Sequence, residues 1–254
     1  MTDQGRIVRP KGRLLTVIVP VYNEVELLPR ALKRLSLVDG IEKQVVVVDD
    51  GSTDGTSGLF EEMLGTGLAD DWLTHGKNIG KGAAIRSGLS VARGDVIAIQ
   101  DGDLEYDPRH LPQLAEPILN GRADVVLGSR LLGTLKFKNE WDLDFKRLCW
   151  GMGAQVLSIA ASMVTGRFFT DIETCQKVFS RGISKRLDLR ENGFGVEPEM
   201  ILKFSRMGAR IEEMPVRYWS RTKEEGKKIN FMHGIEALVC IGRYSFADID
   251  RIEE

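Results

Sequence analysis

The chain has very few cysteines, only three among 254 residues. Cys149, Cys175 and Cys240 form no Cys-x-x-Cys pair and no Cys/His spacing typical of a metal site. Because their number is odd and they are widely separated, they do not suggest a framework of structural disulfides. We therefore expect buried thiols in a reducing compartment.

Long hydrophobic runs are missing, and so is a secretory signal, because residues 1–13 are polar and basic. The nearest to such a run is Leu148 to Gly166, which is free of charge for 19 residues but contains glycine, serine, threonine and glutamine. This composition predicts a buried helix or a helix at a membrane surface, rather than a transmembrane helix. We expect a cytoplasmic protein, with peripheral contact at the inner face of the membrane as an open alternative.

No excess of one charge is present, since 35 Lys and Arg residues balance 37 Asp and Glu residues and give a net charge of -2. This balance argues against a surface devoted to nucleic acid. Three enzyme motifs are absent as well. A P-loop is excluded because Gly82 stands where Ser or Thr is required, and there is no Gly-x-Gly-x-x-Gly for a dinucleotide and no Gly-x-Ser-x-Gly for a hydrolase.

What the first half does contain is an alternation of apolar runs and helical stripes. We predict strands over 14–19, 44–48, 72–74 and 95–99. Helices are predicted between them: one through Leu27 to Leu35 with an Asn23/Glu26 start signature, one capped within Ser52 to Asp54 and reaching about Leu64, and one from Ala83 to Val91. Apolar strands that alternate with helices predict a parallel sheet covered on both faces, with ligands beyond the carboxyl ends of the strands.

The second half is less regular. The predicted elements are a strand over 124–127, a charged stretch over 136–147, the uncharged helix, the run 176–179, a helix containing Glu199 to Phe204, and the segment 211–218. No repeat, low-complexity tract or linker interrupts them. We therefore predict one domain over 14–244, with a nucleotide-sugar half (14–129) and an acceptor half (130–244), between a flexible N-terminal tail (1–13) and a C-terminal tail (245–254).

Three carboxylates follow the predicted strand 95–99 at alternating positions: Asp101, Asp103 and Glu105. Because alternate side chains of a strand point to one side, we expect them to converge on one cation. Oxygen-only ligands suit Mg²⁺ or Mn²⁺, which commonly keep open positions for substrate phosphates. An isolated Asp-Gly-Asp is more often a solvated turn, so the metal site is favoured only because polar motifs also end the preceding strands.

Two of those motifs suit a nucleotide. Asp49 and Asp50 end the second strand, and their carboxylates suit ribose hydroxyls or ring N–H donors, with capping of the next turn as the alternative. The segment Asn78 to Gly82 precedes a helix, so its amides and the Lys81 ammonium are expected to face an anion.

A basic loop with aromatic residues lies near the C-terminus, from Tyr218 to Lys228. Such a charge run is usually solvated surface. Here Gly226 gives backbone freedom, and we expect a diphosphate to be bound by Arg221, Lys227 and Lys228. No role is assigned to the three histidines, because no catalytic or metal-binding spacing connects His75, His110 and His233.

In order and spacing, these motifs resemble those of family 2 glycosyltransferases. The resemblance of the first half rests on Val17 to Glu24, Val45 to Asp54, Asn78 to Gly82 and Gln100 to Glu105. That of the second half, to bacterial relatives of dolichyl-phosphate mannose synthase and other polyprenyl-phosphate glycosyltransferases, rests on Gly128 to Arg130, Asp171 to Phe179 and Gly226 to Asn230. It covers roughly 14–244 and implies the GT-A fold, an α/β architecture with a Rossmann-like, mostly parallel central sheet and helices on both faces.

The resemblance also implies an activity and its residues. A hexose would pass, with inversion, from a UDP- or GDP-sugar to a polyprenyl phosphate in the presence of Mg²⁺ or Mn²⁺. The metal positions match Asp101, Asp103 and Glu105, and the acceptor-phosphate arginines look like Arg130 and Arg147. The family's nucleotide contacts match Pro20, Tyr22, Glu24, Asp50 and Lys81. To these we add, as expected nucleotide-sugar contacts, Asp101 after the strand 95–99 and Arg221 and Lys227 of the basic loop. The sequence departs from the family where Gly151 replaces a serine and where His233 stands at a commonly acidic position.

The expected chemistry depends on charge, because a lipid phosphate is already anionic and needs no general base. The metal and the basic loop would stabilise the departing diphosphate, while Arg130 and Arg147 orient the attacking phosphate. Two alternatives stay open. In the first, the same fold serves a soluble saccharide acceptor, with Asp171 or Glu173 as the base. In the second, the chain is a non-catalytic sugar-nucleotide-binding subunit. The Gln-x-x-Arg-Trp motif of processive polysaccharide synthases is absent.

Overall fold

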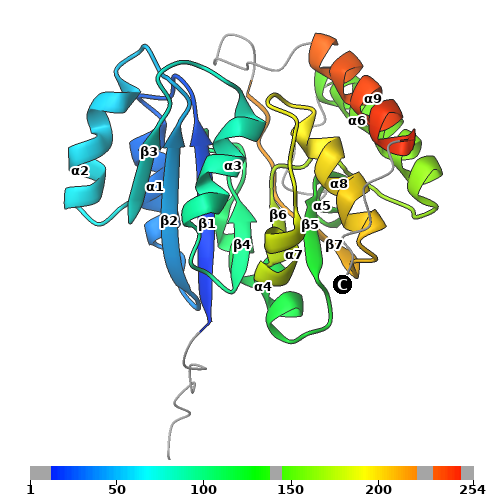
Figure 1. The fold of residues 1–254 in the computed structure, drawn as a ribbon, viewed down its shortest axis with the longest axis horizontal. Helices are drawn as coiled ribbons and strands as arrows, with labels where there is room; N and C mark the ends of the chain where they lie inside the picture. Colours follow the sequence, from blue (N-terminus) through cyan, green and yellow to red (C-terminus); the bar gives the residue numbers. More distant parts are fainter. Residues whose placement is uncertain (1–12, 138–144, 222–230, 247–254) are drawn as a thin grey trace, which may run out of the picture.

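The computed structural model describes residues 13–137, 145–221 and 231–246, with backbone only at 145–152, 231 and 246. The first half alternates strands and helices as predicted (Figure 1). Its elements are β1 (Leu14–Val21), α1 (Leu28–Ser36), β2 (Glu42–Asp49), the 3-10 helix η1 (Thr56–Leu59), α2 (Phe60–Gly65), β3 (Asp71–Thr74), α3 (Lys81–Val91) and β4 (Val96–Ile99). All four strands predicted for this half are confirmed.

The second half contains more helix than the sequence patterns indicated. Its elements are η2 (Pro108–His110), α4 (Leu111–Leu119), β5 (Val125–Ser129), α5 (Arg130–Lys136), α6 (Phe145–Thr165), β6 (Lys177–Ser180), α7 (Arg181–Arg186), α8 (Val196–Arg206), β7 (Ile211–Pro215) and α9 (Phe231–Phe246). The uncharged segment forms most of α6. In the described ranges, no helix combines the length and hydrophobicity needed to span a membrane.

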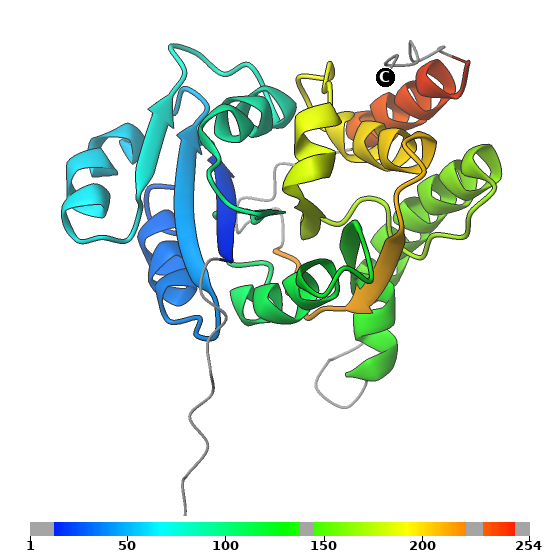
Figure 2. The ribbon, with the colours of Figure 1, turned by 60° about the horizontal axis from the view of Figure 1, so that its bottom comes forward.

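The strands form one seven-stranded sheet in the order β3-β2-β1-β4-β6-β5-β7. The pairs β2–β3, β1–β2, β1–β4 and β5–β7 are parallel, whereas β6 runs antiparallel to both β4 and β5. The predicted mostly parallel sheet is therefore confirmed. Helices α1 and α4 cover one face, and α3 and α8 lie over the other (Figure 2).

Burial on both faces explains why the central strands are apolar throughout. Val45 to Val48 of β2 and all four residues of β4 are buried. A strand with only one covered face would alternate apolar and polar residues. At the edge of the second half, α6 and α9 pack side by side, and α8 contacts both (Figure 1).

The predicted start of α1 is wrong. The helix begins at Leu28, and Asn23 adopts a left-handed backbone with a φ of 51°. The Asn23 amide donates to Ser52 Oγ, and its side-chain oxygen accepts from the amide of Thr53, each at 2.8 Å. Asn23 therefore joins the loops that follow β1 and β2 and does not cap a helix.

The other boundaries differ by a few residues. The helix predicted after β2 is split into η1 and α2. Asp54 accepts from the amide of Thr56, 2.9 Å away, at the start of η1. Helix α9 extends to Phe246, two residues past the predicted boundary at 244. Most of both predicted tails, residues 1–12 and 247–254, lies outside the described residues.

Candidate active site

The carboxyl ends of β1, β2 and β4 lie together, because these strands are parallel neighbours. Pro20 pairs with Val48 of β2 near the end of β1, and Tyr22 follows β1 directly. The amide of Glu24 then donates to Thr56 Oγ1 at 3.0 Å, which fixes the two loops to each other. The edge of the sheet predicted to carry the site is formed.

Asp50 uses its carboxylate inside the protein. It accepts from the amides of Ile79 (3.0 Å) and Gly80 (2.7 Å), lies 2.6 Å from Nδ1 of His75, and is 3% exposed. Nε2 of His75 lies 2.9 Å from Ser87 Oγ on α3. Two of the amides that were expected to face an external anion, those of Ile79 and Gly80, therefore face Asp50 instead. His75, to which no role was assigned, has a structural role. A contact between Asp50 and a nucleotide stays a prediction.

The glycines beside Lys81 allow two segments to touch. Gly80 has a φ of 118°, and a Cβ there would lie 2.4 Å from the carbonyl oxygen of Asn192. A Cβ on Gly82 would lie 2.1 Å from the carbonyl oxygen of Glu191. Any side chain at either position would overlap backbone atoms, so glycine is required. The start of α3 is thereby packed against the segment that precedes α8.

Lys81 lies between two carboxylates. Its Nζ atom is 2.9 Å from Oδ1 of Asp101 and 2.8 Å from Oε1 of Glu197. Burial acts to lower the pKa of Lys81, but these two carboxylates raise it well above its ordinary value. Asp101 and Lys81 were both predicted to contact the nucleotide sugar, whereas Glu197 was missed, because nothing in the sequence of α8 forms a motif.

The acidic segment after β4 differs from the prediction. The strand ends at Ile99, and residues 101–105 turn, with Leu104 in a left-handed conformation (φ 66°). Strand alternation therefore does not orient Asp101, Asp103 and Glu105. In the part of the chain that the structure describes, no three His, Cys, Asp or Glu side chains are arranged to hold a metal ion.

Arg221 forms ion pairs with two of the three carboxylates that were expected to bind the metal, Asp103 and Glu105. Its Nη2 atom lies 2.8 Å from Asp103 and 3.2 Å from Glu24, and its amide donates to Glu105 at 2.9 Å. The other oxygen of Glu105 accepts from the hydroxyl of Tyr218 at 2.5 Å. Both oxygens of Glu105 are thus engaged, and so are those of Asp103, whose Oδ1 accepts from the amide of Glu105 at 3.0 Å. Exposure favours Asp101 and Asp103 as the metal ligands, because their side chains are 24% and 15% exposed and that of Glu105 only 8%.

The electrostatics at Asp103 suit an added cation. Burial, and then repulsion from Asp101 and Glu105, raise the pKa of Asp103 to about 7 despite the attraction of Arg221. A shifted pKa of this kind indicates that negative charge is only partly compensated. The Asp101 and Asp103 side chains are also partly exposed, so an ion from solvent can reach them.

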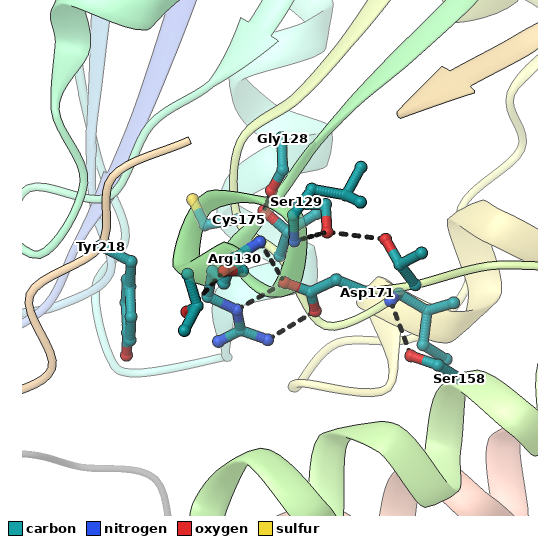
Figure 3. Close-up of polar contacts among 12 residues, drawn as sticks. Gly128, Ser129, Arg130, Ser158, Asp171, Cys175 and Tyr218 are labelled. Carbon is teal, nitrogen blue, oxygen red and sulfur yellow. Dashed lines mark hydrogen bonds and ion pairs between the residues drawn. The ribbon is translucent and has the colours of Figure 1, made fainter. Parts of the chain in front are cut away.

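On the other side of the site, Arg130 is fixed by Asp171 (Figure 3). Its Nε and Nη2 atoms each donate to a different oxygen of Asp171 at 2.7 Å, and its amide donates at 3.0 Å. The guanidinium lies 5.1 Å from the ring centre of Tyr218 and is 22% exposed. No described residue accepts a hydrogen bond from Nη1, so this group is available to a ligand.

Asp171 and Glu173 were the candidate bases for an alcohol acceptor. Both oxygens of Asp171 accept from Arg130, which leaves it poorly suited to take a proton. Oε1 of Glu173 is buried and has no hydrogen-bond partner among the described residues. Burial, and then repulsion from Glu197, raise the pKa of Glu173 to about 7. Of the two, only Glu173 retains the character of a base.

A model of the glycosyl transferase family 2 matches residues 16–175 of the chain, which span β1 to β5 and the segment containing Asp171. The chain is a family 2 glycosyltransferase.

The relatives of this glycosyltransferase include polyprenyl-phosphate transferases. It is 32% identical to an undecaprenyl-phosphate mannosyltransferase of Micrococcus luteus, over 92% of this chain and 95% of that protein. It is 29% identical to a dolichol-phosphate mannosyltransferase of Pyrococcus furiosus, over 84% of this chain and 58% of that one.

A solved structure confirms the GT-A fold. Glucosyl-3-phosphoglycerate synthase from Mycobacterium tuberculosis, in complex with Mn²⁺, UDP and phosphoglyceric acid, matches with a TM-score of 0.67. The match covers 92% of this glycosyltransferase and 79% of that chain at 20% identity. At that identity, the likeness concerns the fold alone.

The structure brings most of the predicted site residues of the glycosyltransferase to the carboxyl edge of the sheet. Arg221 and Lys81 meet the acidic segment there, and Arg130 stands beyond it with Asp171. The side chain of Arg147 and the whole of Lys227 lie outside the described residues. Their predicted roles stay predictions.

Proposed function

We propose that the protein is an inverting glycosyltransferase that moves a hexose from a UDP- or GDP-sugar to a polyprenyl phosphate. A phosphate oxygen of the acceptor attacks the anomeric carbon while the bond from that carbon to the diphosphate breaks. The configuration inverts and the nucleoside diphosphate leaves. The names of the polyprenyl-phosphate relatives support this acceptor class.

The donor side of the site suits a diphosphate with a divalent cation. Asp101 and Asp103 would hold Mg²⁺ or Mn²⁺, which would supply positive charge against the leaving diphosphate. Lys81 would donate an N–H to the same group. Arg221 pairs with Glu24 and Asp103, and it would bind the diphosphate after releasing one of these carboxylates.

The main support for the proposal is that Arg130 is held by Asp171 on one side and keeps donors for a ligand on the other. Asp171 fixes its guanidinium from one side, and Nη1 keeps its donors free. Planar guanidinium groups bind phosphate oxygens through paired donors. Because Asp171 is occupied by this arginine, the arrangement favours an acceptor that brings its own negative charge.

A second feature suits a lipid acceptor. Helices α6 and α9 expose apolar side chains at helical spacing, and we call this set the α6–α9 surface: Val156, Ile159, Met163, Ile235, Leu238 and Val239. Met163 is 80% exposed. Two adjacent helices with apolar outer faces suit the boundary of a bilayer, where a polyprenyl phosphate presents its head group.

The proposal is tested by measuring sugar transfer from UDP- and GDP-sugars in Mn²⁺. The acceptors compared are polyprenyl phosphate, the matching polyprenol without phosphate, and 3-phosphoglycerate. We expect product only with polyprenyl phosphate and none after addition of EDTA. Transfer to 3-phosphoglycerate alone would show that the acceptor is a soluble phosphate and not a lipid. Full activity in excess EDTA would show that transfer needs no metal ion.

One observation favours a second acceptor class. The unpartnered Oε1 of Glu173 is suited to take a proton from a hydroxyl group, which a saccharide acceptor requires. In that case polyprenol or a free sugar would be glycosylated, and Glu173→Gln would abolish the transfer. Under the lipid-phosphate proposal, the same variant retains transfer.

A further inference from the structure

A buried chain of charges connects the acceptor half to the donor side of the site. It begins at Lys177 of β6, which is fully buried. The Lys177 ammonium donates to the carbonyl oxygens of Ile172, at 2.9 Å, and Thr174, and it forms an ion pair with Glu197. One lysine in the core thus has three acceptors, one of them charged.

The chain continues through Glu197 to Lys81 and Asp101. One oxygen of Glu197 pairs with Lys177, and the other lies 2.8 Å from the Lys81 ammonium. Lys81 reaches Asp101 at 2.9 Å on its other side. An ammonium has three donors, and no described residue takes the third.

This arrangement fixes the position of Lys81 more firmly than Asp101 alone would. Lys177 and Glu197 are almost completely desolvated, so moving either away from its partner leaves a buried charge without compensation. Glu197 also stands in the first turn of α8, which lies in the other half of the domain. Without it, Lys81 would neutralise Asp101 by itself and compete with a cation for that carboxylate.

We infer that Glu197 is a positioning residue for the donor: it holds the Lys81 ammonium beside Asp101 with one N–H directed to the diphosphate, so the acceptor half completes the donor site. The inference rests on the proposed function only in taking a sugar nucleotide as the ligand. It concerns the donor and requires no particular acceptor.

The test is a double-mutant cycle read by calorimetric titration with UDP in Mn²⁺, repeated with GDP, in the absence of any acceptor. Glu197→Gln should raise the Kd for the better nucleotide about tenfold, the size of one charged hydrogen bond. Lys81→Met should have a similar effect. The double variant should be no weaker than Lys81→Met, because Glu197 acts through Lys81.

Glu199→Gln provides the matched control. Glu199 lies on the same helix, is equally buried and pairs with Lys203 at 2.7 Å, but it does not contact Lys81. Its effect on the Kd should be the same with and without Lys81→Met. If Glu197→Gln also adds to Lys81→Met in full, the inference is overturned.

Glu197→Gln leaves the buried Lys177 ammonium without its charged partner, and this can destabilise the fold. The variant Lys177→Met/Glu197→Gln is therefore measured beside it, because it removes both charges at similar volume. This double variant should fold and still show the raised Kd. Glu197→Asp should recover part of the affinity.

Steady-state turnover gives a second measurement. With a saturating acceptor, Glu197→Gln should raise KM for the donor about tenfold and change kcat less than about twofold. An unchanged Kd for the nucleotide in folded Lys177→Met/Glu197→Gln would contradict the inference.

The outcome is independent of the lipid proposal, because the nucleotide titrations contain no acceptor. Failure to glycosylate polyprenyl phosphate would leave the cycle unaffected. Conversely, additive effects in the cycle would remove the role of Glu197 and leave the acceptor assignment standing.

Discussion

Charged side chains at the site are mostly held by opposite charges from distant parts of the sequence. Arg130 is the first residue of α5, and its partner Asp171 lies 41 positions later. This pair fixes the direction of the guanidinium before any ligand arrives. Restricting a side chain in advance reduces the entropy lost on binding.

Arg130→Ala should therefore lower kcat/KM for the acceptor by about 10- to 100-fold, the loss expected for charged hydrogen bonds. Arg130→Lys keeps the charge but loses the paired donors, and it should recover only part of the activity. Transfer assays with varied acceptor measure both effects. The Kd for UDP or GDP should stay nearly constant, and a large change in it would assign Arg130 to the donor instead.

Glu173→Gln should change how stability depends on pH. Burial and repulsion from Glu197 and Asp171 raise the pKa of Glu173 from 4.5 to about 7, against attraction by Lys177 and Arg130. The folded protein therefore holds this proton more tightly than the unfolded chain. Its stabilising contribution is complete below pH 4.5 and is lost as the pH rises to about 7.

Urea unfolding at several pH values measures the difference between wild type and Glu173→Gln. The advantage of wild type should fall by up to about 3 kcal/mol between pH 4 and pH 8, the equivalent of the shift in pKa. A difference that is constant with pH would show that Glu173 ionises normally.

For single residues, the sequence predicted which polar side chains lie at strand ends, but it did not predict what they contact. Asp50 and Lys81 were recognised because they directly follow apolar or turn-forming segments. Their partners His75 and Glu197 were missed, since each contact depends on how separate elements pack. Glu105 was assigned to the metal by strand alternation and by the family resemblance, whereas the chain turns at Leu104. Its metal role stays a prediction.

At the scale of elements, the start of α3 depends on residues without side chains. Gly82 packs against the carbonyl oxygen of Glu191, and Lys81 stands next to it. The sequence motif was interpreted as an anion-binding loop. The structure shows a packing role for it, since the glycines of this motif bring α3 against the segment before α8.

Gly82→Ala should therefore reduce the free energy of unfolding by about 1–3 kcal/mol, as overpacking does, although alanine favours helix more than glycine. It should also weaken nucleotide binding through displacement of Lys81. Thermal unfolding and titration with UDP or GDP measure the two effects. Gly76→Ala is the control, because a Cβ there meets no atom within 4 Å. Equal stability of the two variants would contradict the packing argument.

The elements up to β4 were more predictable than those that follow. Strands β1, β2 and β4 are mostly buried on both faces, and they were recognised together with the more exposed β3. Four helices were not predicted: α4, α5, α7 and α9. Helices α5 and α7 have seven and six residues, which complete fewer than two turns and give no clear periodicity. The antiparallel direction of β6 was also not predictable, because a buried strand of four residues has the same apolar pattern in either direction.

For the whole molecule, the apolar α6–α9 surface predicts association with lipid. Replacing Ile159 and Met163 with serine should reduce binding to liposomes that contain anionic lipid, measured by flotation, by at least about threefold, since two exposed apolar side chains are removed. The control is Leu37→Ser, which changes a side chain that is 67% exposed on the nucleotide half. Equal loss in both variants would indicate nonspecific adsorption.

The place of β6 in the sheet has a consequence for synthesis on the ribosome. Strand β4 ends at Ile99, but the strand that covers its outer edge begins only at Lys177. A growing chain therefore exposes an apolar strand edge until the later segment emerges, and such edges promote aggregation. Glu197 emerges later still, so a chain that stalls before α8 carries the strands of the donor site without the carboxylate that holds Lys81. Nucleotide affinity would then distinguish finished chains from arrested ones.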